Sequence, residues 1–256
     1  MPNVSVTAGE NGEQSNSALP RGLLASGARE MGIPLSEHQL DQFERLTSLL
    51  IEWNARFNLT RVTEPAEIAV KHYLDSISLL SFVKVTGGMR VMDVGSGAGL
   101  PGLPLKIVSP DIQLTVLDSV KKKLSFVEAA AQELGMEGVR IVHARAEDAA
   151  RDKAHREQYD FVVSRAVARL SVLAELCIPF CRVGGEFVAY KGPDAGQEIE
   201  QASKAFRVLG GELEAVHEFT LLHADAGRTL VLVRKAHLTN ALYPRKAGDP
   251  ARTPLE

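Results

Sequence analysis

The sequence predicts an α/β fold in which a mostly parallel sheet ends in an antiparallel hairpin and is preceded by a helical cap. After Arg90, short apolar runs typical of strands alternate with segments of helical periodicity, which indicates parallel strands joined by right-handed crossovers. A glycine-rich turn, residues 95–99, follows the first run. The last two strand-like runs are separated only by a short turn, so they are expected to pair antiparallel.

The chain is expected to begin with a disordered extension, residues 1–35. Its first twenty residues contain neither Lys nor Arg and no apolar stretch, which excludes a secretory signal. They are rich in Asn, Ser, Gly and Glu, a composition typical of disorder.

Residues 36–86 are expected to form the helical cap. Ser36 and Gln39 make a capping-box pattern, after which apolar residues recur at helical spacing as far as Phe57. A second helix is expected from about residue 65 to residue 80, and Gly87 and Gly88 then interrupt the pattern.

Residues 87–256 are expected to form the sheet domain, with a basic tail at its end. Strands are expected near 90–95, 113–118, 139–143, 159–164 and 185–191, and helices near 101–109, 120–134, 168–181 and 194–209. The hairpin strands are expected at 213–222 and 229–235, around the turn Asp225-Ala226-Gly227.

Composition restricts the functional classes. The chain has 256 residues, of which 45% are hydrophobic and 24% charged, as in a globular protein large enough to bury a core. No run approaches the roughly 18 apolar residues of a membrane helix. The formal net charge is −3, so nucleic-acid binding needs a local basic patch. Cys177 and Cys181, spaced i, i+4 in a helical pattern, are expected as two core thiols of a helix in a reducing compartment, and a disulfide or a metal pair is the alternative. We therefore expect a cytoplasmic monomer with no metal and no membrane association.

The most informative segment is the glycine-rich turn itself. Asp93 ends the first strand, and Gly95, Gly97 and Gly99 alternate with small residues. Glycine permits positive φ and removes the Cβ atoms that keep a ligand away from the backbone. Such a turn at the carboxyl end of the first parallel strand is where open α/β sheets bind nucleotide-like ligands.

Two adenosine ligands compete for this turn. The spacing Gly97-x-Gly99-x-x-Gly102 matches the dinucleotide fingerprint, and Asp118, nineteen residues after Gly99, is placed to accept hydrogen bonds from ribose hydroxyls. With Asp93 two residues before the first glycine, the pattern resembles the S-adenosylmethionine (SAM) loop of class I methyltransferases better than a dehydrogenase turn, and this favours SAM over NAD. So does the terminal hairpin, because a dinucleotide fold would repeat a second βαβαβ half. A glycine-rich turn without any ligand is the third alternative.

Several separated motifs together resemble the RsmG (GidB) family of bacterial small-subunit rRNA guanine-N7 methyltransferases. The resemblance runs from about residue 36 to the end of the chain. The matching segments are WNARFNLT (53–60), KHYLDS (71–76), DVGSGAGLPGLPL (93–105), LDSVKKK (117–123), RAE (145–147), SRA (164–166) and YPRKAGDP (243–250). The resemblance implies the class I SAM-dependent methyltransferase fold, a Rossmann-like sheet. It also implies SAM as cofactor, and small-subunit (16S) rRNA or a ribosomal particle as partner.

The resemblance also implies the cofactor-binding residues, which are Gly95, Gly97, Gly99, Leu100, Asp118, Ala146, Glu147 and Arg165. Guanine N7 carries a free lone pair, so we expect no catalytic acid or base. The position where amine methyltransferases carry an Asn/Asp-Pro-Pro-aromatic motif reads Ser164-Arg165-Ala166-Val167 here. Arg165 is expected at the cofactor or at guanine O6, or else paired with a carboxylate.

The RNA-binding surface is expected to include Lys121, Lys122 and Lys123, in the first turn of a helix, and Arg245 and Lys246 in an extended tail. Three other functions stay open on the residues alone. They are a methyltransferase of small molecules, an NAD-dependent oxidoreductase and a SAM-responsive RNA-binding protein.

Overall fold

The computed structural model describes residues 18–166, 168–222, 224 and 227–256, and it contains a single seven-stranded sheet. The strand order is β3-β2-β1-β4-β5-β7-β6. The strands are β1 Arg90–Val94, β2 Gln113–Asp118, β3 Val139–His143, β4 Tyr159–Ser164, β5 Cys181–Lys191, β6 Gly211–Thr220 and β7 Gly227–Lys235. Strands β1 to β5 pair in parallel, and β7 pairs antiparallel with both β5 and β6. The expected α/β class and the terminal hairpin are confirmed, while Asp225 and Ala226 of the expected turn lie outside the described residues.

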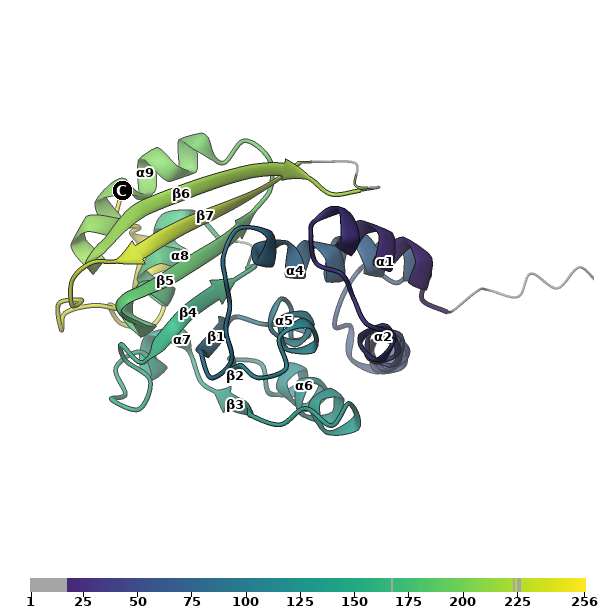
Figure 1. Ribbon diagram of the computed structural model, residues 1–256. Helices are drawn as coiled ribbons and strands as arrows, with labels where there is room; N and C mark the ends of the chain where they lie inside the picture. Colours follow the sequence, from purple (N-terminus) through teal and green to yellow (C-terminus); the bar gives the residue numbers. More distant parts are fainter. Residues whose placement is uncertain (1–17, 167, 223, 225–226) are drawn as a thin grey trace, which may run out of the picture.

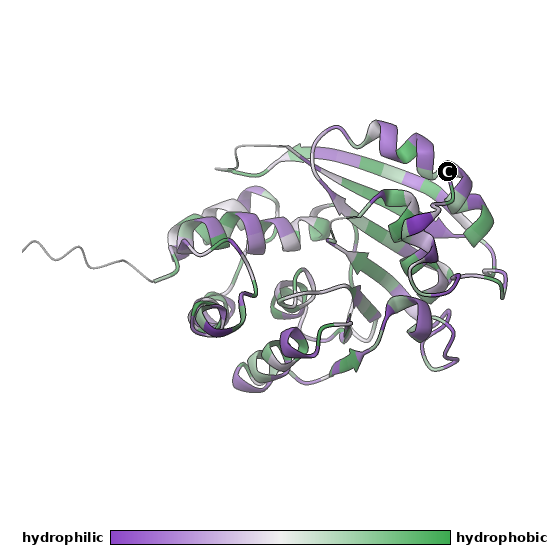
Figure 2. Ribbon diagram, turned by 180° about the vertical axis from the view of Figure 1, so that it is seen from behind, coloured by the Kyte–Doolittle hydropathy of each residue, from purple (hydrophilic) through white to green (hydrophobic). Residues whose placement is uncertain are grey.

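Helices cover both faces of the sheet. They are α1 Arg21–Glu30, α2 Glu37–Phe57, α3 Pro65–Glu67, α4 Asp75–Ile77, α5 Gly102–Val108, α6 Lys121–Glu133, α7 Ala146–Ala149, α8 Leu170–Cys177, α9 Gly196–Leu209 and α10 Asp249–Arg252. Figure 1 shows α1, α2, α5 and α6 on one side of the sheet, and α8 and α9 on the other. In the view from behind, the apolar strands of the sheet lie between these layers (Figure 2).

The two layers follow from the alternation of side chains along each strand. On β4, Phe161 and Val163 face the core beneath the N-terminal helices, whereas Val162 faces the core beneath α8 and α9. Strands buried on both faces are typical of parallel sheets. The glycine-rich turn therefore emerges from a sheet whose centre is buried on both sides.

Part of the segment expected to be disordered, residues 21–30, forms helix α1. Leu24 and Ala28 of α1 are buried, and a Cβ on Gly27 would approach the Leu74 side chain to 2.4 Å. A ten-residue helix is marginal alone, so this packing stabilises it. The capping box of Ser36 and Gln39 on α2 is confirmed.

Three further segments differ from expectation. The helix expected over 65–80 is divided into α3, a π-helical segment Ile68–Leu74, α4 and a 3₁₀ turn Ser78–Ser81. The helix expected to reach residue 181 ends at Cys177, because Pro179 in the next turn lacks a donor N–H, and Cys181 opens β5. Both cysteines are buried free thiols, as expected, but only Cys177 lies in a helix. The tail is not a free arm, because α10 interrupts it and it packs against the domain.

Candidate cofactor and substrate site

The glycine loop, residues 95–99, leaves β1 at the carboxyl edge of the sheet. Gly95, Gly97 and Gly99 all have positive φ, at 69°, 58° and 76°. A Cβ built on Gly97 would meet no heavy atom within 4 Å, so its backbone faces open space. A Cβ on Gly99 would lie 2.6 Å from Leu103 Cδ1. Gly97 therefore leaves room for a ligand, whereas Gly99 permits close packing of α5.

Asp118 fixes the glycine loop from the end of the neighbouring strand. Its Oδ2 accepts the N–H of Gly97 at 2.9 Å, and its Oδ1 accepts the N–H of Val120 at 2.8 Å. A carboxylate has about four lone-pair sites, so both oxygens retain acceptor capacity. The expected hydrogen bonds to ribose hydroxyls are compatible with these contacts.

Asp93 orders the turn from beneath. Its Oδ2 accepts the N–H of Gly102 at 2.8 Å, and a Cβ on Gly102 would lie 2.8 Å from the same oxygen. Burial raises the pKa of Asp93 to about 7, although the hydrogen bond from Gly102 and the charge of Arg165 oppose the shift. Asp93 is fully buried, and its Oδ1 has no partner in the described part of the chain.

Arg165 leaves the end of β4 and connects the loop edge to the helical cap. Its Nη1 donates to Asp75 Oδ2 at 3.0 Å and to the carbonyl of Lys71 at 3.0 Å, in the π-helical segment. The other oxygen of Asp75 accepts from Nε of Arg228 at 3.0 Å. Within the described residues, Nε and Nη2 of Arg165 have no partner. Arg165 is therefore paired with a carboxylate, which was one of the expected alternatives, and its Nε and Nη2 atoms can still donate to another group.

His72 lies on the same segment as Lys71 and is neutral near pH 7. Burial, assisted by the positive charge of Arg165, lowers its pKa to about 4. Its Nε2 is 2.9 Å from the Thr60 hydroxyl, while its Nδ1 is buried without a described partner. Ser96 Oγ, in the glycine loop, is also buried and unpartnered among the described residues. Buried polar atoms are normally hydrogen-bonded, and the other two unpartnered ones among the described residues are Glu186 Oε2 and Thr229 Oγ1.

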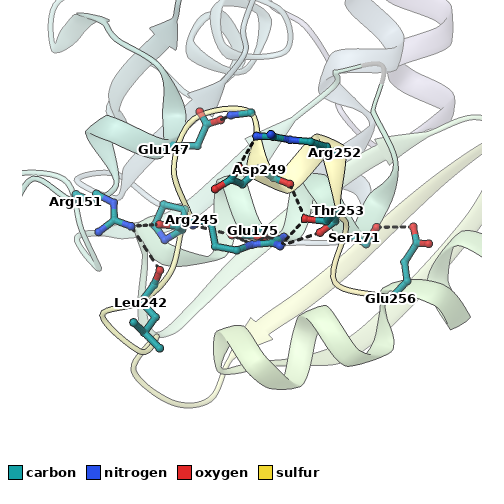
Figure 3. Close-up of polar contacts among 12 residues, drawn as sticks. Glu147, Arg151, Ser171, Glu175, Leu242, Arg245, Asp249, Arg252, Thr253 and Glu256 are labelled. Atoms are coloured by element: carbon teal, nitrogen blue, oxygen red, sulfur yellow. Dashed lines mark hydrogen bonds and ion pairs between the residues drawn. The ribbon is translucent and has the colours of Figure 1, made fainter.

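The expected adenine-side residues contact the end of the chain. Residues 236–256 form a C-terminal strap, which Figure 3 shows against α7 and α8. Glu147 Oε1 accepts the N–H of Gly248 at 3.0 Å, and its other oxygen has no partner among the described residues. Ala146 is buried beside it, and Leu100 is buried in the core under the N-terminal helices. These positions are compatible with the expected cofactor contacts and do not test them.

The basic residues expected to bind RNA fall into two groups. Lys121, Lys122 and Lys123 open α6, and the first two are exposed. Arg245 instead donates from Nη2 to the fully buried Glu175 at 2.6 Å and from Nη1 to the Thr253 carbonyl at 2.8 Å. Arg245 is therefore a structural residue of the strap, and Lys246 next to it is exposed.

Sequence reasoning did not find two acidic residues of this region in their present roles. Asp75 holds two arginines at once, and neither partner is near it in the sequence. Glu175 gave no signal at all, because a single acid in an apolar helical pattern does not reveal a partner seventy residues away.

Two kinds of feature are absent from the part of the chain that the structure describes. Across residues 18–256 apart from the gaps, no three His, Cys, Asp or Glu side chains are grouped so that they could hold a metal ion. None of the helices described here is both long and apolar enough to cross a bilayer.

Comparisons with known proteins agree with this geometry. The family model GidB, described as rRNA small subunit methyltransferase G, matches residues 39–225. The chain is 45% identical over 232 residues to "Ribosomal RNA small subunit methyltransferase G" of Desulforamulus reducens, covering 91% of this chain and 97% of that one. It is 47% identical over 232 residues to the protein of the same name from Pelotomaculum thermopropionicum, with the same coverage.

Solved structures share the fold at low identity. A putative methyltransferase in complex with the Haloferax volcanii Trm112 activator has a TM-score of 0.56 at 15% identity, over 73% of this chain and 98% of that one. The CurJ carbon methyltransferase has a TM-score of 0.52 at 14% identity, over 85% of this chain and 71% of that one. The expected methyltransferase fold is confirmed.

Proposed function

The chain belongs to the GidB family of small-subunit rRNA methyltransferases, and we propose that it transfers the methyl group of SAM to N7 of a guanine in that rRNA. SAM, when bound, supplies a methyl group activated by the positive sulfur. The proposal assigns the chain the tasks of holding the cofactor, orienting the base and excluding water.

The observation that carries the cofactor assignment is the open space over Gly97 beside Asp118. A backbone without a Cβ, at a φ of 58°, lets a ligand approach closely, and the adjacent carboxylate suits ribose hydroxyls. Gly95, Gly97, Leu100, Asp118, Ala146 and Glu147 would hold the cofactor in this proposal.

The residues around β4 support attack by an atom that needs no deprotonation. Ser164 and Arg165 offer no Asn/Asp-Pro-Pro apparatus for an exocyclic amine. The thiols are unsuited to covalent attack on a pyrimidine, because burial raises the pKa of Cys181 to about 12 and that of Cys177 even more strongly. Guanine N7 has a free lone pair at neutral pH, so positioning alone suffices.

Arg165 is the residue proposed to orient the guanine. Its Nε and Nη2 donors suit guanine O6, which is a major-groove-edge acceptor like N7, while N7 itself has to stay free. Asp75 and the Lys71 carbonyl hold the opposite side of the guanidinium. Because His72 is neutral, it adds no charge at the base.

The RNA surface is proposed to run from Lys121 and Lys122 on α6 to Lys246 on the strap. Exposed lysines attract phosphates, and this binding weakens with added salt. Since RNA is recognised by shape and unstacked bases, a partly assembled ribosomal particle is the proposed substrate, which places the reaction in the cytoplasm.

The experiment incubates the protein with radiolabelled SAM and small-subunit particles, or their naked rRNA, from a strain that lacks the protein. The label is then mapped by cleavage specific for N7-methylguanine. We expect incorporation at a single guanine. SAM binding without transfer to either RNA preparation would contradict the proposed substrate.

A further inference from the structure

A second hollow lies at the opposite end of the parallel strands. Its volume is about 450 Å³, and its polar side chains come from Arg90 at the start of β1, Gln113 and Thr115 on β2, and Arg140 on β3. The length of β1 places it about 13 Å from the glycine loop. Figure 1 shows β3 at the edge of the sheet, so the hollow opens beside an edge strand.

Two guanidinium groups face this hollow without a carboxylate partner. Arg140 makes no hydrogen bond or ion pair with any residue the structure describes. Arg90 donates from Nη1 to the neutral Gln158 Oε1 at 3.1 Å, and its guanidinium lies 5.1 Å from the centre of the Tyr159 ring. The nearby carboxylate of Asp160 accepts the backbone N–H of Arg90, and Arg182 neutralises it with an ion pair of 2.7 Å.

The charges of Arg90 and Arg140 also act on the neighbouring His155. Burial is the main cause of the lowered pKa of His155, and the charges of Arg140 and Arg90 add to it, whereas Asp152 opposes it. His155 is itself buried, and its Nδ1 lies 2.7 Å from the Tyr159 hydroxyl. The field at this end of the sheet therefore favours an anion.

A third polar residue, Thr115, lines the same hollow. Thr115 is only 6% exposed, and its hydroxyl has no hydrogen-bond partner in the described part of the chain. The sheet register sets Thr115 beside Arg140, while Arg90 lies one row lower beside Gln113. Because neighbouring strands are about 4.8 Å apart and two residues along a strand span about 6.6 Å, the Cα atoms of the two arginines lie roughly 12 Å apart, with Thr115 and Gln113 between them.

We propose that this hollow binds a phosphate group, with Arg90 and Arg140 as the two cationic donors and Thr115 as a neutral donor between them. Guanidinium forks match the oxygens of a phosphate, and the hydroxyl supplies the third direction. The phosphate belongs either to an RNA backbone or to a free phosphorylated compound, since both present the same oxygens. The site is separate from the proposed methyl-transfer site.

The test titrates inorganic phosphate into the full-length protein at constant ionic strength, with binding followed by calorimetry. Arg140→Gln is expected to weaken binding about tenfold or more, since it removes a charge-assisted hydrogen bond, and Thr115→Val is expected to weaken it several-fold. The exposed Arg207 on α9 offers a matched control, and Arg207→Gln is expected to leave binding unchanged. Unchanged binding in Arg140→Gln, or no saturable binding by the wild-type protein, would overturn the proposal.

Competition then identifies the source of the phosphate. Displacement by a short single-stranded RNA without terminal phosphates supports an RNA backbone, and displacement only by a 5′-mononucleotide supports a free phosphorylated compound. Displacement by neither overturns the proposal. These titrations contain no methyl donor, so a failure to bind phosphate does not contradict the proposed methyl transfer. Likewise, a failure of methyl transfer does not contradict phosphate binding.

Discussion

The glycine loop and the C-terminal strap both lie on the surface of the same domain, yet they differ in how completely their buried polar groups are hydrogen-bonded. In the strap, Arg245 satisfies the buried Glu175, and Gly248 satisfies Glu147. No side-chain atom of residues 236–256 is buried without a partner. Around the loop, Asp93 Oδ1 and Ser96 Oγ are buried with no partner among the described residues.

This contrast separates structural charge from functional charge. A buried polar group without a partner is destabilising by about 1–3 kcal/mol, so a fold retains few of them. Where the pairing is complete, as in the strap, the charges stabilise the fold. Where it is incomplete, as at the loop, we propose that the remaining groups meet a ligand. By the same reasoning, Arg245 is paired within the strap and is no longer assigned to the RNA surface. Arg165 keeps two donor atoms without a described partner and stays in the proposed site.

The largest expected effect tests the complete pairing in the strap. Arg245→Met leaves the Glu175 carboxylate buried and uncompensated, so we expect the free energy of unfolding to fall by about 3–5 kcal/mol in chemical denaturation. Arg252→Met is the matched control, because its side chain is 72% exposed, and it should change stability by less than about 0.5 kcal/mol. Equal effects of the two substitutions would show that the strap is not anchored through Glu175.

The next effect tests the open space over Gly97. Gly97→Val places a branched side chain where the ligand is proposed, so SAM affinity is expected to fall by about a hundredfold or more. Gly135→Val is a close control, because Gly135 has a φ of 60° and an equally open Cβ position in the turn after α6. Both variants should lose about 1–2 kcal/mol of stability from the left-handed conformation. If Gly135→Val lowers SAM affinity equally, the loop assignment is wrong.

A smaller effect is expected from the cluster at the start of α6. Replacing Lys121, Lys122 and Lys123 together by Gln should weaken RNA binding and reduce the slope of log affinity against log salt by up to about 2, at about 0.7 for each phosphate contact with a single strand. SAM affinity should stay unaltered. The double variant Arg29→Gln, Arg207→Gln removes exposed charge elsewhere. A slope that falls equally in this control would remove the cluster from the RNA surface.

A pH dependence of stability is expected from Asp93. Its pKa is raised from 3.8 to about 7 in the folded protein, so the folded state binds the proton more tightly than the unfolded state. Stability from this residue is complete below pH 3.8 and is lost as the pH rises towards 7. Asn does not titrate, so the Asp93→Asn variant does not lose this stability. Its free energy of unfolding should therefore increase relative to that of the wild type as the pH rises from about 4 to about 7. A difference that is independent of pH would show that Asp93 titrates normally.

Several features followed from local sequence because their causes are local. Gly97 needs positive φ within its own turn, Ser36 and Gln39 cap a helix three residues apart, and the strand–helix alternation reflects periodicities of 2 and 3.6 residues. The family resemblance added the cofactor and the substrate class, on motifs spread over most of the chain. Even the distinction between hairpin and crossover depended only on the length of the connection.

The roles of the charged residues were decided by the tertiary structure. Asp75 meets Arg165 across 90 residues and Arg228 across 153, and Arg245 meets Glu175 across 70. Gly99 is indistinguishable from Gly97 in the motif, yet Leu103 occupies the space beside it. Sequence periodicity determines which face of an element is buried. Pairing between residues distant in the sequence depends on how the elements are packed, because a hydrogen bond needs a donor–acceptor distance of about 3 Å and exposed charges are screened beyond about 8–10 Å.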